Sequence, residues 1–187
     1  MAADAFVREG RPDDAGDIAA IQLRAWRELY GSALPAEVRD ELAGAEAAER
    51  FAEHWRESME RPPTSRHRLL VAVQPVDEAG GDRAAEVAGF ASLGPAGDDD
   101  RWPRTDAELY EFHVAAVHAR QGHGSRLINA AADTLRDDSF TTAYIWVPDD
   151  DTTTAKFLES AGWRPDGAHR EIDLGAPIPM TRLHVGL

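Results

Sequence analysis

Cysteine is absent from the 187-residue sequence. This excludes disulfides, cysteine nucleophiles and thiolate metal sites, and a cytoplasmic location is the default expectation. An apolar stretch of membrane-spanning length is also missing, as is an N-terminal apolar run of the signal-peptide type, so no membrane association is expected. Basic residues are scarce: 20 Lys and Arg stand against 34 Asp and Glu, a formal net charge of −14. Such a surface repels phosphate backbones, which argues against DNA or RNA as partners.

The excess of acid has two interpretations. An acidic surface attracts a cationic substrate such as an amine. It also serves general solubility, and the acidic residues are spread along the whole chain, as solubility alone would require. The most concentrated run is Asp98-Asp99-Asp100. No spaced carboxylate or histidine pattern turns it into a metal site, so it is expected to be a solvated loop, with steering of a cationic acceptor as the alternative.

The most informative stretch joins a strand to a helix through a glycine-containing turn. Residues 107–114 alternate and read as a strand, and apolar residues return at helical spacing after residue 122. Between them lies Gln121-Gly122-His123-Gly124-Ser125. A helix start directs unpaired N–H groups and the positive end of its dipole outward, which makes an anion site. The alternative is a helix that only needs a tight turn.

This stretch resembles motif A of the GNAT superfamily, the acyl-CoA-dependent N-acetyltransferases. That motif is a strand, then Arg/Gln-x-x-Gly-x-Gly/Ala, then a helix, and Gly122 and Gly124 stand at its two glycine positions. Downstream, residues 144–147 resemble the family's next strand. Residues 151–163 resemble its Asn-x-x-Ala-x-x-Phe-Tyr-x-x-x-Gly-Phe block. With both blocks in order, spanning roughly residues 106–167, the chain is identified as a member of this superfamily.

The resemblance implies an enzyme that transfers an acetyl group from acetyl-CoA, as cosubstrate, to a primary amine of a small molecule or peptide, without a metal. It places the cofactor against the motif strand, the glycine loop and the start of the following helix. The implied cofactor residues are Phe112, His113, Val114, Ala119, Arg120, Gln121, Gly122, His123, Gly124, Ser125, Asp151 and Phe157.

Two positions depart from the family pattern. The first motif position, usually Arg or Gln, is Ala119, with Arg120 beside it. The position where many relatives carry a general-acid tyrosine is Leu158. Leucine cannot donate a proton, so that role is absent or is supplied from elsewhere, with Tyr110 and Tyr144 as candidates. The alternative function is a non-catalytic CoA-binding sensor or interaction module.

Acetyl transfer to an amine needs a base, because a lysine-like amine has a pKa of about 10.4. The candidates on the motif strand are Glu108, Glu111 and His113. Strict alternation groups Glu108 with Phe112 and puts Glu111 and His113 on the other face, although a bulge would exchange the faces partway along. Glu108 occupies the position where the resemblance implies a carboxylate, and is the predicted base. The resemblance assigns oxyanion stabilisation to the N–H of Val114.

The acceptor is expected at the first helix pair, which lines the acceptor pocket in this family. Trp26 and Tyr30 are the predicted substrate-binding residues, and ordinary core packing is the alternative for both. His113, His118 and His123 recur every five residues and fall on strand, loop and helix start. That spacing does not match the spacing of metal-ligand residues, so a metal site is not predicted.

The length predicts one domain, residues 1–187. The expected element order is β-α-α-β-β-β-α-β-α-β-β, with a hairpin turn at 79–82. This order matches the GNAT fold of the α/β (α+β) class, a mixed six- to seven-stranded central sheet with helices on both faces. The sequence does not decide between a monomer and a homodimer.

Overall fold

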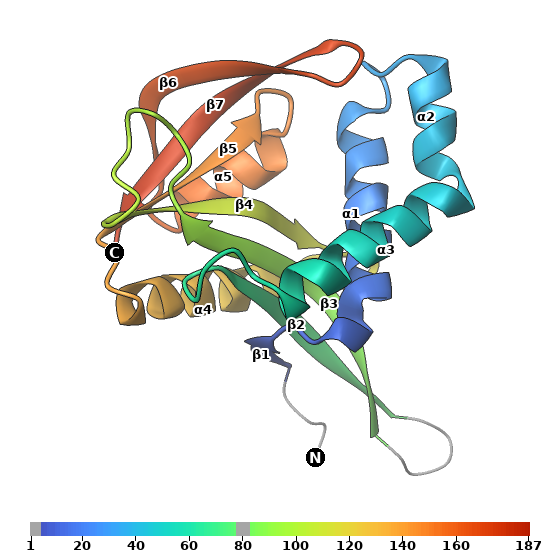
Figure 1. The fold of residues 1–187 in the computed structure, drawn as a ribbon, viewed down its shortest axis with the longest axis horizontal. Helices are drawn as coiled ribbons and strands as arrows, with labels where there is room; N and C mark the ends of the chain where they lie inside the picture. Colours follow the sequence, from blue (N-terminus) through green and yellow to red (C-terminus); the bar gives the residue numbers. More distant parts are fainter. Residues whose placement is uncertain (1–4, 78–82) are drawn as a thin grey trace.

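The computed structural model describes residues 5–77 and 83–187. These residues build a seven-stranded sheet in the order β1-β2-β3-β4-β5-β7-β6 (Figure 1). Neighbouring strands are antiparallel except β4 and β5, which are parallel. This mixed sheet confirms the predicted fold class. The strands are β1 (Phe6–Glu9), β2 (Arg68–Asp77), β3 (Arg83–Pro95), β4 (Asp106–Val114), β5 (Thr142–Pro148), β6 (Arg164–Asp173) and β7 (Pro177–Gly186).

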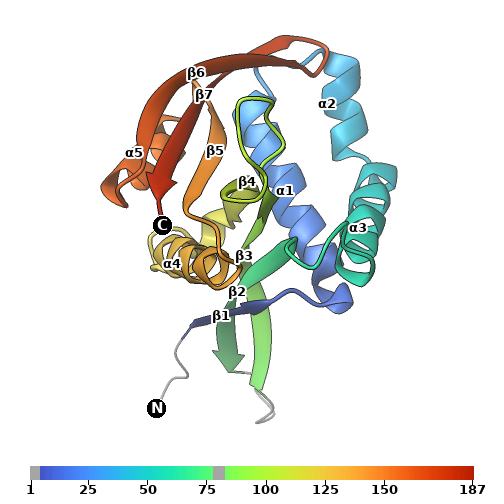
Figure 2. The same ribbon diagram turned by 60° about the vertical axis from the view of Figure 1, so that its left-hand side comes forward.

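Helices cover both faces of the sheet, as expected. Figure 2 shows α4 and α5 on one side of the strands and α1, α2 and α3 on the other. The helices are α1 (Ala15–Tyr30), α2 (Ala36–Ala43), α3 (Ala45–Glu60), α4 (His123–Asp137) and α5 (Thr152–Ser160), with 3-10 turns η1 (Pro12–Asp14) and η2 (Ala116–His118). No helix in the described part of the chain has the length and apolarity needed to cross a bilayer.

The central strands are buried on both faces, which explains why they are apolar at consecutive positions. Along β2, Leu70 and Ala72 belong to the core on the α4 and α5 side. Val71 and Val73 belong to the core on the α1 and α3 side, where Trp55 of α3 is also buried. The sheet therefore lies between two packed layers, which fix the position of its middle strands.

Helix α2 is the element that the sequence analysis misses. The expected order has two helices between the first and second strands, whereas the structure has three, and residues 36–43 form the additional one. Pro35 directly precedes the helix, where its fixed φ suits a helix start. No residue of α2 is fully buried, so the sequence has no strong apolar stripe by which the helix could be recognised. The predicted turn at 79–82 lies outside the described residues.

Candidate active site

The parallel pair β4–β5 separates partway along. Pairing runs from Asp106 and Thr142 to Leu109 and Ile145, and beyond that point the two strands diverge. The gap holds a cavity of about 140 Å³, closed by the end of α1, the start of α5 and the β6–β7 hairpin. Open α/β sheets bind ligands at such carboxyl ends of their strands. Seven predicted site residues line this cavity: Trp26, Tyr30, Glu108, Phe112, His113, Asp151 and, among the alternative bases, Glu111.

Backbone N–H groups of β4 face this opening. The N–H of Ala115 donates to the carbonyl of Ala88, which precedes the β3 residue paired with Val114, at 2.8 Å. Successive residues of a strand direct their N–H groups to opposite edges. The N–H groups of Phe112 and Val114 therefore point away from β3, toward the edge that β5 leaves free. The predicted oxyanion donor thus lies at the opening, and its role stays a prediction.

A β-bulge at Tyr110 sets the direction of the side chains that follow. Ser92 of β3 pairs with Glu111, whereas the next residue, Leu93, pairs with Leu109, so Tyr110 is an extra residue on β4. One extra residue exchanges the two faces of a strand beyond it. The face of the sheet on which a β4 side chain lies therefore changes at the bulge, and residues after Tyr110 do not follow the alternation of those before it.

Beyond the bulge, Phe112 and Val114 pack toward α4 and α5. Glu111 and His113 face α1 and α3, as Glu108 does before the bulge. The grouping of Glu108 with Phe112 that strict alternation predicts is therefore wrong, and the exchange of faces is what the structure shows. His113 is a predicted cofactor residue, but its side chain lies on the α1 and α3 side of the sheet, so the cofactor side of β4 receives only its backbone.

The turn before α4 has the geometry of an anion site. Arg120 and Gly122 are both in the left-handed region, with φ of 63° and 84°, which turns the chain sharply into the helix. Arg126 N–H donates to Gly122 O at 3.1 Å. The N–H groups of the three residues His123 to Ser125 precede that first bond and have no intrahelical acceptor. Together with the helix dipole they favour a phosphate.

Gly124 marks the place where this turn meets the opening. A Cβ on Gly124 would lie 3.4 Å from Cζ of Phe157 and 3.7 Å from Cγ2 of Val114. Phe157 stacks on Phe112, with ring centroids 5.7 Å apart and planes 8° apart. Asp151 caps α5 by accepting the N–H of Thr154 at 3.0 Å. Four predicted cofactor residues from β4, α4 and α5 thus converge on one side of the sheet.

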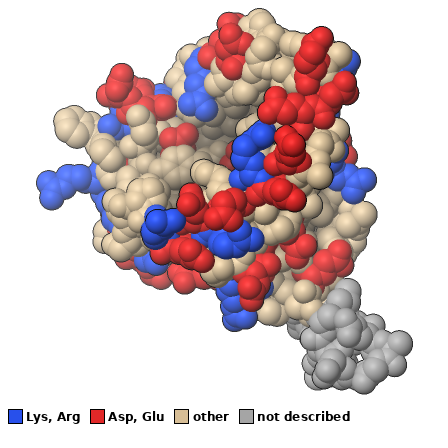
Figure 3. Space-filling model, turned by 45° about the vertical axis from the view of Figure 1, so that its right-hand side comes forward, with Lys and Arg blue, Asp and Glu red and all other residues tan. Residues whose placement is uncertain are grey.

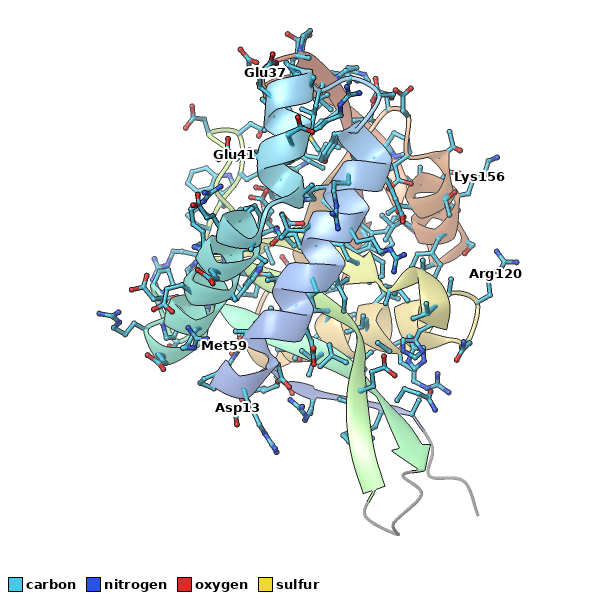
Figure 4. The ribbon with its side chains drawn as sticks, turned by 90° about the vertical axis from the view of Figure 1, so that its right-hand side faces the viewer. Asp13, Glu37, Glu41, Met59, Arg120 and Lys156 are labelled. Atoms are coloured by element: carbon cyan, nitrogen blue, oxygen red, sulfur yellow. The ribbon has the colours of Figure 1, made fainter. Side chains whose placement is uncertain are left out.

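Basic side chains flank the same region. In Figure 4, Arg120 and Lys156 project to the same side of the molecule, from the turn before α4 and from α5. Ala119, Gln121 and Ser125 are exposed around this turn. The side chain of His123, by contrast, is buried at 1% exposure beneath it, and burial lowers its pKa. Of the predicted loop residues, His123 therefore offers only its backbone N–H to the solvent side.

Glu108 lies in the cavity with one carboxylate oxygen held by a hydroxyl. Tyr144 Oη donates to Glu108 Oε2 at 2.8 Å. That hydroxyl accepts the N–H groups of Gly97 and Asp98 at 3.1 and 3.2 Å. Burial raises the pKa of Glu108, and the hydrogen bond from Tyr144 opposes this rise. A carboxylate with a raised pKa inside a cavity suits a general base.

A chain of hydrogen bonds runs from α3 through α1 to β4. Trp55 Nε1 donates to Gln22 Oε1 at 2.7 Å, and Gln22 Nε2 donates to Glu111 Oε1 at 2.9 Å. The other oxygen of Glu111, Oε2, lies 2.5 Å from Nε2 of His113. Since both oxygens of Glu111 are engaged, Glu111 is the less available base. The sequence gives no sign of this chain, because its members are far apart along the polypeptide.

Comparison with known proteins identifies the family. The model of the acetyltransferase (GNAT) family matches residues 23–163. This chain belongs to the GNAT family. The uncharacterized N-acetyltransferase YuaI of Bacillus subtilis strain 168 is 30% identical over 141 residues, which are 75% of this chain and 70% of YuaI. The predicted family and the predicted acyltransferase class are thereby confirmed, and catalysis is favoured over a non-catalytic binding module.

Solved structures agree on the fold. The PaiA N-acetyltransferase of Thermoplasma acidophilum, in complex with coenzyme A, superposes with a TM-score of 0.69 at 13% identity, over 99% of this chain and all of its own. YncA of Salmonella typhimurium, whose structure contains its cofactor acetyl-CoA, superposes with a TM-score of 0.66 at 19% identity, over 99% of this chain and 95% of its own. At these identities the likeness establishes the GNAT fold alone.

The tyrosine that many GNAT relatives use as a general acid has no counterpart at Leu158. Leu158 is fully buried in the core on the α4 and α5 side. The two alternative tyrosines direct their protons elsewhere: Tyr110 Oη donates to Pro95 O at 2.5 Å, and Tyr144 Oη donates to Glu108. Burial raises the pKa of Tyr110 to about 12. A tyrosine at position 158 would have to enter a packed core, so a restored proton donor is not expected there.

The predicted acceptor residues, Trp26 and Tyr30, form an aromatic wall of the cavity between β4 and β5. Trp26 meets Tyr30 edge to face, with centroids 6.1 Å apart, and Phe51 of α3 at 5.5 Å. Tyr30 also packs with Leu34 and Ile178 in a small core under the β6–β7 hairpin. Burial, followed by the charge of Glu111, raises the pKa of Tyr30 to about 12. Both the binding and the packing interpretation fit this position.

The face that carries α1, α2 and α3 is hollowed in Figure 3. Side chains other than Asp, Glu, Lys and Arg make up most of the hollow, and acidic side chains outnumber the basic ones around it. An excess of acid around the hollow favours the approach of a cation. The acidic excess of the sequence is thus also seen on the face that carries α1, α2 and α3.

The aspartate run before β4 is neither a metal site nor a freely solvated loop. Arg182 of β7, whose side chain is 5% exposed, binds Asp98 at 2.7 Å, Asp100 at 2.5 Å and Asp166 at 2.8 Å. The solvated-loop prediction is therefore wrong for Asp98, whose side chain is 19% exposed, whereas Asp100 pairs with Arg182 but stays exposed to solvent. In residues 5–77 and 83–187, no group of three His, Cys, Asp or Glu side chains gathers in a metal-binding arrangement.

Proposed function

We propose that this GNAT protein transfers the acetyl group of acetyl-CoA to the primary amine of a small-molecule or peptide acceptor. Glu108 is the general base and the N–H of Val114 is the oxyanion donor. The observation that carries the proposal is the cavity between β4 and β5, which brings a buried carboxylate and free strand N–H groups together. A single catalytic domain, residues 1–187, working in the cytoplasm, is part of the proposal.

The residues present fit the donor. The pyrophosphate of acetyl-CoA suits the N–H groups at the start of α4, with Arg120 and Lys156 nearby. The unbranched pantetheine arm suits the gap where β4 and β5 diverge beyond Leu109 and Ile145, and the lack of a side chain on Gly124 keeps the start of α4 close to Phe157 and Val114. Acetyl-CoA supplies the acetyl group as a thioester, and the remaining chemistry belongs to the chain. The strand N–H groups polarise the carbonyl, and a thiol with a pKa of about 8.5, by analogy with Cys, leaves without a strong acid.

Proton transfer is assigned to Glu108. An amine with a pKa of about 10.4 enters as a cation and must lose a proton before it attacks. Glu108 accepts that proton, directly or through one water, while Tyr144 holds its Oε2. Because the pKa of Glu108 is raised, the proton is accepted more readily than by an exposed glutamate. Glu111 and His113 are hydrogen-bonded to each other, so neither is assigned the role of base. Their proposed role is to orient the amine.

Release of free CoA tests this proposal. Purified protein is incubated with acetyl-CoA and a panel of primary amines, and the thiol that appears is measured over a reaction without amine. Amine-dependent release, with a product heavier by one acetyl group in mass spectrometry, is the expected result. Binding of acetyl-CoA without release for any amine on the panel would favour the non-catalytic CoA-binding module instead.

A valine at Gly124 is expected to weaken acetyl-CoA binding by roughly tenfold or more, about 1.4 kcal/mol per tenfold. Its γ-carbons would enter the space between Phe157 and Val114 and move the start of α4, where the pyrophosphate is proposed to bind. Isothermal titration calorimetry measures the change. Asn129→Val, exposed on the same helix, adds the same branched side chain away from the opening. Equal affinities in the two variants, with intact folds, would move the cofactor site elsewhere.

Tyr30→Phe is expected to change the KM for the acceptor severalfold and to leave acetyl-CoA affinity unchanged. The hydroxyl lies in the cavity near Glu111 and Asp151, and its removal takes away one partner for an ammonium group. Steady-state kinetics with the best amine of the panel, alongside calorimetry with acetyl-CoA, separate the two effects. A lower acetyl-CoA affinity with an unchanged acceptor KM would place the acceptor away from Tyr30.

A further inference from the structure

A second, larger cavity adjoins the active site on the α3 side. It has a volume of about 450 Å³ and lies between the second half of α3, the junction of β1 and β2, and the bulge of β4. This volume is within the range of small-molecule sites in proteins. Neither the cofactor nor the reacting amine of the proposed function occupies this larger cavity.

Two residues connect this cavity to the opening between β4 and β5. Tyr110 and Glu111 line both cavities. The bulge at Tyr110 separates the pairing positions of Leu109 and Glu111 and so brings these two residues to the boundary. The two cavities therefore share a wall at Tyr110 and Glu111, on the strand that also carries Glu108. The larger cavity is placed to hold the part of the acceptor that does not react.

The larger cavity has aromatic and apolar residues along one part of its wall, and polar residues such as Glu9, His54 and Ser92 along the rest. The ring of His67 stacks on that of Tyr110, with centroids 6.0 Å apart and planes 12° apart. The Tyr110 ring is fixed by its hydrogen bond to Pro95 O. Trp55, Met59 and Leu69 complete the apolar lining. Fixed aromatic walls bind flat rings well, because stacking adds to the burial of apolar area.

The charges around the cavity disfavour an acidic ligand. Arg68 lines it, but its guanidinium binds both oxygens of Asp138, at 3.1 and 3.0 Å, and lies 3.4 Å from Glu9. Burial lowers the pKa of His67, which keeps that ring neutral near pH 7. Glu111, at the boundary with the active site, is a carboxylate placed to meet an ammonium group. The expected ligand thus has a cationic end and an uncharged body.

We infer that this cavity binds the body of the acceptor, and that the acceptor is a primary amine joined by a short chain to an aromatic ring, without an acidic group. The ring fills the space between α3 and the Tyr110–His67 pair, and the amine passes Glu111 to reach Glu108. This inference rests on the proposed function and specifies its substrate class.

A comparison of three amines tests the inference. The catalytic efficiency kcat/KM is measured for 2-phenylethylamine, for ethylamine, which lacks the ring, and for L-phenylalanine, which adds a carboxylate. The expected preference for 2-phenylethylamine over ethylamine is about 100-fold, from burial of the ring. The kcat/KM for L-phenylalanine is expected to be at least tenfold lower than that for 2-phenylethylamine. Equal efficiencies for 2-phenylethylamine and ethylamine would overturn the inference and leave the proposed function standing.

A cavity-filling variant ties the preference to this place. Ser58 lines the cavity from α3, and Ser58→Phe is expected to reduce the preference for the aromatic amine to a few-fold. Glu57→Phe, on the adjacent exposed position of the same helix, carries the same ring outside the cavity and is expected to keep the full preference. An unchanged preference in Ser58→Phe, with a native circular dichroism spectrum, would overturn the placement.

Failure of the proposed function is distinguishable from failure of this inference. If no amine releases CoA, calorimetry with 2-phenylethylamine alone decides the question. Binding to the wild-type protein and to Glu57→Phe, with loss of at least tenfold in affinity in Ser58→Phe, supports the cavity as the ring site even then. Absence of binding to the wild-type protein overturns it.

Discussion

Replacement of Glu108 by glutamine lowers the turnover rate by about 10² to 10⁴-fold, the usual range for loss of a general base. Glutamine keeps the size of the side chain and can still accept the hydrogen bond from Tyr144, so the cavity is expected to hold its shape. Acetyl-CoA affinity, measured by calorimetry, is expected to change little. The rate loss then reports the missing proton acceptor.

The pH profile gives this prediction a second readout. Burial raises the pKa of Glu108, and the carboxyl accepts a proton only when it is ionised. In the wild-type protein the rate therefore rises with pH as Glu108 ionises, and this rise disappears in Glu108→Gln. Glu111→Gln is the matched control, since it removes the neighbouring carboxylate on the same strand face. Wild-type rates for Glu108→Gln across pH 6 to 9, with slow turnover in Glu111→Gln, would transfer the base role to the Glu111–His113 pair.

Replacement of Arg182 by methionine is expected to lower the free energy of unfolding by about 3–5 kcal/mol, the usual cost of removing one partner from a buried ion pair. Arg182 is 5% exposed, and two of its partners, Asp98 and Asp166, have side chains only 19% and 11% exposed. Without the guanidinium, Asp98 keeps the N–H of Trp146 as a partner, and Asp166 keeps its ion pair with Arg101. The two carboxylates then lose the charge that lies between them. Asp100 is well exposed and is expected to regain water, so it adds little to the loss.

Urea denaturation measures the effect, and Arg136→Met provides the control. Arg136 forms an exposed pair with Asp133 on α4, and such pairs contribute little to stability. The pH dependence gives a further check. Arg182 lowers the pKa of Asp100 from its ordinary value of 3.8 to about 2. Because Asp100 is well exposed, this pair contributes only a small stability, which is present above pH 4 and lost as the pH falls through about 2. A loss below 1 kcal/mol in Arg182→Met would show that the cluster is dispensable.

The convergence of the proposed cofactor residues could be predicted from sequence because it depends on local backbone chemistry, while their role stays a prediction. Gly122 and Gly124 indicate a tight turn into a helix. The first turn of any helix has N–H groups without intrahelical acceptors, whatever surrounds it. The two sequence blocks also lie on the consecutive elements β4, α4, β5 and α5, so a short separation along the chain corresponds to a short separation in space. Residues from β4, α4 and α5 accordingly meet where the sequence pattern places them.

The acceptor half could not be predicted, because it depends on contacts between distant segments. Gln22 and Glu111 are bonded across 89 positions, and Arg182 meets Asp98 across 84. An isolated glutamine on an amphipathic helix, or an arginine in a strand, has many possible partners. The bulge at Tyr110 was foreseen only as an option, because its position is set by the register of β3 against β4. Without that position, Glu108 could not be grouped with His113.

The bulge also has a consequence for the order of events in catalysis. It makes β4 a partition, with the apolar side chains of Phe112 and Val114 on one side and the carboxylates of Glu108 and Glu111 on the other. Each substrate can then enter from its own side and leave without displacing the other. The chain contains no cysteine, and the carboxylates lie across the strand from the place proposed for the thioester. Direct transfer within a ternary complex, seen as intersecting double-reciprocal plots in initial-rate kinetics, is the reaction order that this partition imposes.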